Sequence, residues 1–182
     1  MAFCDWSSDV CSSDLVSFLI SGFENIIITI PVLVFFQSML LDMSGNVGTQ
    51  SLAVTIIGLN EPQQPKWKKV LGKSFVTGIL LGLLVALISF ISIFAFISIT
   101  KTTMISEQPF SYPLALKVSG IISFSMLIAI IIANLTGILI PLTLSKLKID
   151  PAVASGPLIT TLNDLITVLV YYGLASLLLT IL

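Results

Sequence analysis

Long apolar runs without a charged residue dominate the chain and predict membrane-spanning helices. Three of them cover 27 residues from Ser74 to Thr100, 28 from Val118 to Ser145 and 18 from Leu165 to Leu182. A fourth apolar run, from Asn25 to Asn60, contains one charged residue, Asp42. About 20 apolar residues cross a bilayer as a helix, so each of these runs is long enough to span a membrane or nearly so.

Composition agrees with this pattern. The 182 residues are 56% hydrophobic and 9% charged, whereas about a quarter of a soluble domain is charged. We therefore expect an all-α integral membrane protein that forms a polytopic helical bundle. Membrane lipid is its expected surrounding partner. The chain has no histidine and no arginine, which excludes histidine-based catalysis, and it has no basic patch for nucleic acid.

The apolar pattern predicts five spans, the first of them partial. Their approximate bounds are 15–22, 26–59, 70–100, 113–145 and 157–181. A straight helix over 26–59 would be about 50 Å long, beyond a hydrocarbon core of about 30 Å, so it must tilt, protrude or break. Pro31, Gly45 and Gly48 are its candidate break points. Interruptions of the 113–145 span are expected at Asn134, Gly137 and Pro141.

The lysines predict the orientation of these spans. Six of the eight fall in two connections: Lys66, Lys68, Lys69, Lys73, Lys146 and Lys148. If the helices alternate, both connections lie on one side of the membrane, and the positive-inside rule makes that side cytoplasmic. We therefore expect a multi-pass protein of the cell inner (plasma) membrane, with 102–110 and the C-terminal Leu182 outside.

Residues 1–14 differ from the rest of the chain. They have no apolar period, contain the near-repeat SSDV and SSDL, and lack the basic start and apolar centre of a signal peptide. We interpret them as a non-native tail of the kind produced by adaptor read-through, with a short polar tail as the alternative. Cys4 and Cys11 lie in this segment and carry no disulfide prediction.

The stretch from Asp150 to Asp164, DPAVASGPLITTLND, directly precedes the last apolar run. An ionised aspartate near the centre of a bilayer costs roughly 2.5–3.5 kcal/mol, so its carboxylate must face a partner, water or an ion. If Pro157 opens a helix, three- and four-residue steps bring the polar residues onto one face. This predicted stripe consists of Pro157, Thr160, Thr161, Asp164, Thr167 and Tyr171.

A second polar stretch, Leu40–Ser51, lies inside the apolar run that contains Asp42. On a helix one face would carry Ser38, Asp42, Gly45, Asn46 and Thr49. The small residues allow another helix to come close, and Asn46 offers a carbonyl oxygen. Helix packing and pore lining are both consistent with this face when it is taken alone.

Together the two stretches resemble the MgtE family of magnesium channels, which has related animal carriers. The family has an Asp-Pro-Ala start, a small-Gly-Pro step, a threonine-rich turn and an aspartate, which Asp164 matches. Its Gly-Gly-Asn-x-Gly-x-Gln motif fits here as Gly45, Asn46, Gly48 and Gln50, with Ser44 at the first glycine. The resemblance implies a five-helix transmembrane domain, a truncated first helix and a fragment without the cytosolic N and CBS domains.

The resemblance also implies a transported ion and a place for it. In the family the aspartate faces the pore and holds hydrated magnesium, so Asp164, with Thr160 and Asn46, is the expected Mg²⁺ site. The expected pore-lining residues are Asp42, Gly45, Thr49, Gly156, Pro157, Thr161 and Thr167. One carboxylate and a few oxygens per chain supply little for a cation, so we expect a homodimer with the pore at its two-fold axis. Spacing alone does not separate magnesium from manganese, cobalt or calcium.

Three other interpretations remain open at this point. A sodium- or proton-coupled divalent cation exchanger would use Asp42 as its coupling carboxylate. An intramembrane aspartyl protease would pair Asp42 with Asp164, but its Gly-x-Gly-Asp motif is absent because Thr161-Leu162-Asn163 precedes Asp164. A packed fragment that conducts nothing is the third. We expect a transporter and not an enzyme.

Overall fold

The computed structural model describes residues 14–60, 67–101, 111–150 and 156–179, and five labelled helices lie within these ranges. They are α2 (Glu24–Thr29), α3 (Val32–Asn60), α4 (Trp67–Thr100), α5 (Tyr112–Lys146) and α6 (Gly156–Leu179), and residues 14–21 are helical too. No described residue belongs to a strand, and the all-α class is confirmed. Most of the predicted tail, the 102–110 connection and Leu182 lie outside the described residues.

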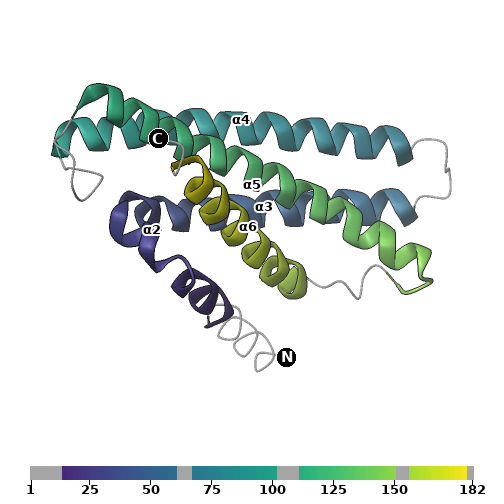
Figure 1. Cartoon of the computed structure of the whole chain (residues 1–182). Coiled ribbons are helices and arrows are strands. Elements are labelled where there is room, and N and C mark those ends of the chain that lie inside the picture. The colour runs from purple at the N-terminus through teal and green to yellow at the C-terminus, as the bar shows by residue number, and fades with distance from the viewer. Residues whose placement is uncertain (1–13, 61–66, 102–110, 151–155, 180–182) are drawn as a thin grey trace.

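The long helices alternate in direction. Phe35 near the start of α3 contacts Phe96 near the end of α4, and Ser89 of α4 donates a hydrogen bond to Ser123 of α5 at 3.3 Å. In Figure 1, α3, α4 and α5 run side by side while α6 crosses them at an angle. The end of α3, the start of α4 and the end of α5 lie at the same end of the bundle.

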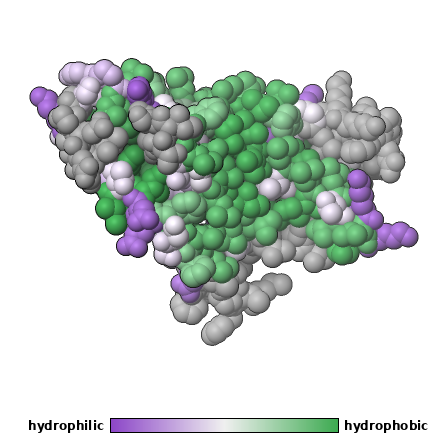
Figure 2. Space-filling model, in the orientation of Figure 1, coloured by the Kyte–Doolittle hydropathy of each residue, from purple (hydrophilic) through white to green (hydrophobic). Residues whose placement is uncertain are grey.

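α5 packs against α3, α4 and α6, and α3 likewise packs against the other three long helices. The fully buried side chains of α5 include Ile122, Met126 and Ile130. α4 instead leaves one apolar face exposed, with Leu80, Leu84, Leu87, Ile88 and Ile91 among its residues. Figure 2 shows a broad apolar surface across the middle of the molecule, with hydrophilic residues towards two ends. This is the distribution expected of a helical bundle surrounded by lipid.

Three helices of the described part are long and apolar enough to cross a membrane: Gly72–Thr100, Tyr112–Lys146 and Ile159–Leu178. α3 is longer than the last of these but carries polar residues along one face. α3 is therefore a helix with one polar face beside three apolar helices. Whether that polar face is covered by the other helices or left exposed bears on the position of the candidate site.

The break in the 26–59 run lies at its proline and not at its glycines. Ile30 leaves the helical region with φ −136° and ψ 79°, and α3 begins after Pro31, which has no N–H to donate. α3 continues unbroken through Gly45 and Gly48, so the expected break at these glycines was wrong. Both keep their N–H donors, and the helix can therefore continue.

α5 is also continuous, contrary to the interruptions expected within it. It runs from Tyr112 to Lys146 with Pro141 inside it, while Asn134 and Gly137 are buried packing residues. A proline inside a helix is tolerated in membranes where neighbouring groups compensate for the lost backbone bond. The polar and small residues of α5 therefore mark contacts with other helices.

Candidate functional site

The polar face of α3 points away from the rest of the chain. Ser38, Asp42 and Asn46 are exposed, whereas Leu40 and Ser44 on the other side of the helix are buried. We call Ser38, Asp42, Gly45, Asn46 and Thr49 the outer polar face. A Cβ added at Gly45 would meet no atom within 4 Å, so none of the helices that the structure describes fills the space above it. Thr49 is half-buried, and its hydroxyl lies 2.9 Å from the Gly45 carbonyl oxygen, to which it donates.

The predicted stripe on α6 divides into two parts. Thr160, Thr161 and Asp164, in its N-terminal half, are each half-buried. Thr167 and Tyr171, further along, have no exposed surface. Among the stripe residues from Thr160 onwards, only Asp164 and the two threonines before it are therefore open to the outside. Gly156 and Pro157 are the first two residues of α6.

Tyr171 and Tyr172 attach the buried end of α6 to α3. The Tyr171 hydroxyl donates to the Leu33 carbonyl oxygen at 3.2 Å, and the Tyr172 hydroxyl donates to the Gln37 side-chain oxygen at 2.5 Å. The two rings meet edge to face with centroids 5.2 Å apart. Tyr171 thus has a packing role, and the predicted stripe included it only because of its position on the helix.

Two buried asparagines that lie outside the predicted site link the long helices. Asn134 of α5 accepts a hydrogen bond from the Ser51 hydroxyl of α3 and donates to the Phe75 carbonyl oxygen of α4 at 3.2 Å. A Cβ added at Gly78 of α4 would overlap its amide group. Asn134 therefore joins three helices at one point.

Asn163 of α6 has a similar environment. It has no exposed surface, its side-chain oxygen accepts a hydrogen bond from Thr136 of α5, and a Cβ added at Gly48 of α3 would overlap its amide. Its side-chain nitrogen has no hydrogen-bond partner among the described residues. The only signal in the sequence was an amide next to Asp164 inside an apolar helix.

Comparison with known proteins decides the family. The family model described as a divalent cation transporter, MgtE, matches residues 37–174. The chain belongs to the MgtE family. The resemblance found in its two polar motifs is thus confirmed, and the family is one of transporters and not of enzymes.

Curated MgtE proteins are similar over most of this chain. The magnesium transporter MgtE of Bacillus subtilis (strain 168) is 35% identical over 160 residues, which is 87% of this chain and 32% of the relative. The magnesium transporter MgtE of Thermus thermophilus is 31% identical over 167 residues, 91% of this chain and 33% of the relative. The chain therefore spans about a third of the length of these MgtE relatives.

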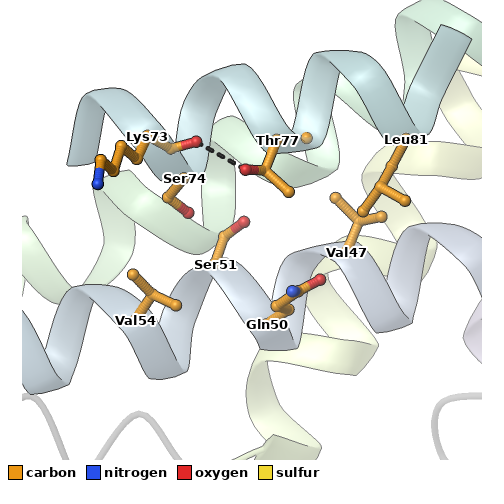
Figure 3. A pocket seen from close by; sticks show the side chains of 9 residues that line it. Val47, Gln50, Ser51, Val54, Lys73, Ser74, Thr77 and Leu81 are labelled. Carbon is orange, nitrogen blue, oxygen red and sulfur yellow. Dashed lines mark hydrogen bonds between the residues drawn. The ribbon is translucent and has the colours of Figure 1, made fainter. Parts of the chain in front are cut away.

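A cleft of about 230 Å³ lies between α3 and α4 of this MgtE family member, and Figure 3 shows its lining. The lining residues are Val47, Gln50, Ser51, Val54, Lys73, Ser74, Thr77, Gly78 and Leu81. Lys73 is the only charged residue among them, and the Thr77 hydroxyl is already bonded to the Lys73 carbonyl oxygen at 2.9 Å. A positive charge beside the cleft disfavours a cation there.

The described residues contain no group of three or more His, Cys, Asp or Glu side chains close enough to share a metal. Within the described part of one chain, at most two such side chains could therefore share a cation, and its other ligands would be neutral oxygens or water. Magnesium suits such an environment, because it gives up its water shell reluctantly and is often held through one or two carboxylates.

Proposed function

We propose that this chain is the membrane part of a magnesium transport pathway, in which two copies enclose a pore and Asp164 binds the hydrated ion. The proposal draws on the family and on relatives that are named magnesium transporters. We further propose that the lysine-rich connections are cytoplasmic and that the C-terminus is outside, following the positive-inside rule.

The observation that carries the proposal is the outward direction of Asp42 and Asn46. These residues lie midway along α3 and are exposed, while the helix buries its opposite face in the bundle. A carboxylate facing lipid at that depth costs roughly 2.5–3.5 kcal/mol on insertion scales. A water-filled pore shared with a second copy removes that cost, because the outer polar face then meets water instead of lipid.

A two-fold axis also doubles the oxygens available to the ion. Each chain contributes the Asp164 carboxylate, the Thr160 hydroxyl and the Asn46 carbonyl oxygen, which act on a magnesium ion that keeps part of its water shell. Asp42, Gly45, Thr49, Gly156, Pro157 and Thr161 line the remaining path. Rings of carboxylates attract cations, while binding through water remains weak enough for release.

Uptake of magnesium into proteoliposomes tests this assignment. Asp164→Asn removes the charge and keeps the shape, so flux falls to near background while the protein still inserts and folds. Asp42→Asn is the matched control, and substantial flux remains because its carboxylate lines the path without holding the ion. Flux through Asp164→Asn equal to that of the parent, at equal protein density, would end the assignment.

The same assay separates a channel from a coupled exchanger. Flux through a pore follows the magnesium gradient alone and persists when sodium is absent and the pH is equal on both sides. Flux that requires an opposing sodium or proton gradient would instead establish the exchanger.

A further inference from the structure

Asn163 is fixed on two sides within the bundle. Its side-chain oxygen is bonded to Thr136 of α5, and its amide fills the space that Gly48 of α3 leaves by having no side chain. At the same crossing, a Cβ added at Gly137 of α5 would overlap the Gly48 carbonyl oxygen. α3, α5 and α6 therefore meet at one point, and Asn163 is the side chain that α6 contributes to it.

This contact is poorly explained by stability alone. The Asn163 side-chain nitrogen is buried without a hydrogen-bond partner among the described residues. An unsatisfied buried polar group costs about 1–3 kcal/mol. A leucine at this position would avoid that cost, as at Leu162 and Leu165 beside it. The amide therefore calls for a role that an apolar side chain does not supply.

The direction of the next side chain provides that role. Asp164 follows Asn163 directly, so their side chains keep a fixed angle around the axis of α6. A rotation of α6 by about 20° would move a side chain at the helix surface by about 2 Å, given a helix diameter of about 10–12 Å. Binding groups must be held within about 0.5 Å and 10–20° of their working geometry, so such a rotation misdirects the carboxylate.

We propose that Asn163 is a positioning residue for the ion site, and that its place between Gly48 and Thr136 fixes the rotation of α6 and so the direction of the Asp164 side chain. This inference rests on the proposed function, because it assigns the orientation of the carboxylate that binds the ion. Asn163 itself does not bind the ion, since its side chain is enclosed by α3 and α5.

The chain contains a matched control for this test. Asn134 is as deeply buried as Asn163 and is hydrogen-bonded to two other helices. It lies against Gly78 in the way that Asn163 lies against Gly48. Asn134 is on α5, however, and is distant from Asp164 in the sequence. Asn163→Leu and Asn134→Leu are compared by the magnesium concentration that gives half-maximal flux into proteoliposomes. Asn163→Leu raises that concentration roughly 10- to 100-fold, the usual cost of losing a group that orients a metal ligand. Asn134→Leu changes the half-maximal concentration less than twofold, when flux is normalised to the amount of folded protein.

The two glycines give an independent pair. Gly48→Ala places a Cβ where the Asn163 amide lies, and Gly78→Ala does the same at Asn134. Gly48→Ala therefore raises the half-maximal concentration as Asn163→Leu does, and the double variant is no worse than the more severe single one, because both displace the same contact. Equal effects of the Gly48 and Gly78 variants would reduce Asn163 to ordinary packing and overturn the proposal.

A second readout is independent of the role of Asp164 in transport. Asp164→Cys is reacted with a charged, water-soluble thiol reagent in three versions of the chain: with both asparagines, with Asn163→Leu and with Asn134→Leu. The reaction rate changes severalfold only with Asn163→Leu if Asn163 sets the side-chain direction. If Asn163→Leu leaves the reaction rate of the cysteine at 164 unchanged, the positioning role is overturned. If Asn163→Leu changes that rate but Asp164→Asn still conducts magnesium like the parent, only the proposed ion site is overturned.

Discussion

At the scale of single residues, glycines set how closely the helices approach. The Gly48 backbone lies against Gly137, and Gly82 of α4 packs against Leu127 and Ile130 of α5. Small residues are the usual means of close helix contact in membranes, where no hydrophobic driving force acts between helices. Gly45 of α3 and Gly173 of α6 have no such role among the described residues, because a Cβ at either would meet no atom within 4 Å.

This difference predicts opposite outcomes for one substitution. Gly137→Ala would drive a methyl group into the Gly48 carbonyl oxygen and should lower the free energy of unfolding by about 1–3 kcal/mol, as overpacking does. Gly173→Ala should be neutral or stabilise by up to about 1 kcal/mol, because alanine favours a helix and the space is open. Thermal unfolding of the purified protein in detergent measures both. A Gly137→Ala protein as stable as Gly173→Ala would show that the crossing relaxes at no cost.

At the scale of the helices, the sequence predicted what depends on composition and missed what depends on contacts. The uncharged runs 74–100 and 118–145 lie within α4 and α5, and the two polar motifs carry the family resemblance. Pro31 breaks the chain because it lacks an N–H, a property that is local. Whether Asn134 or Gly137 interrupts a helix or packs it depends on what lies opposite, and that information is not local.

The candidate site divides in the same way. The stripe containing Asp164 was predictable from three- and four-residue steps, but the burial of Thr167 and Tyr171 depends on where α3 crosses α6. The exposure of Asp42 likewise depends on which face of α3 the bundle covers. The role of Asn163 required the position of Gly48, which is more than 100 residues away in the sequence.

The orientation of α5 in the membrane can be tested at its two ends. Ser111 directly precedes α5 and Ser145 lies in its last turn, and both serines are exposed. The helix has 35 residues and is therefore about 50 Å long at 1.5 Å per residue. In a variant without Cys4 and Cys11, Ser145→Cys should react only with a thiol reagent on the cytoplasmic side and Ser111→Cys only from outside. The expectation follows from Lys146 and Lys148 beside Ser145. Reaction of both cysteines from one side would contradict a membrane-spanning α5.

At the scale of the whole molecule, two kinds of surface need different surroundings. The exposed face of α4 is apolar and suits lipid, whereas the exposed face of α3 carries Asp42 and Asn46. A single chain in a bilayer satisfies the first surface and leaves the second in contact with lipid. We therefore expect an assembly that encloses the outer polar face of α3 and leaves α4 outside.

We predict a dimer whose two α3 helices face each other across water. Asn46→Cys should be cross-linked between copies by a membrane-permeant reagent with two thiol-reactive ends, in a variant without Cys4 and Cys11. Leu87→Cys is the control, because Leu87 is on the exposed apolar face of α4 and should remain uncross-linked at the same reagent concentration. The mass of the detergent-solubilised protein should correspond to two chains. A monomeric mass at every protein concentration would count against a shared pore, and so would equal cross-linking of the two cysteines. In either case the water around Asp42 would have to be held by a single chain.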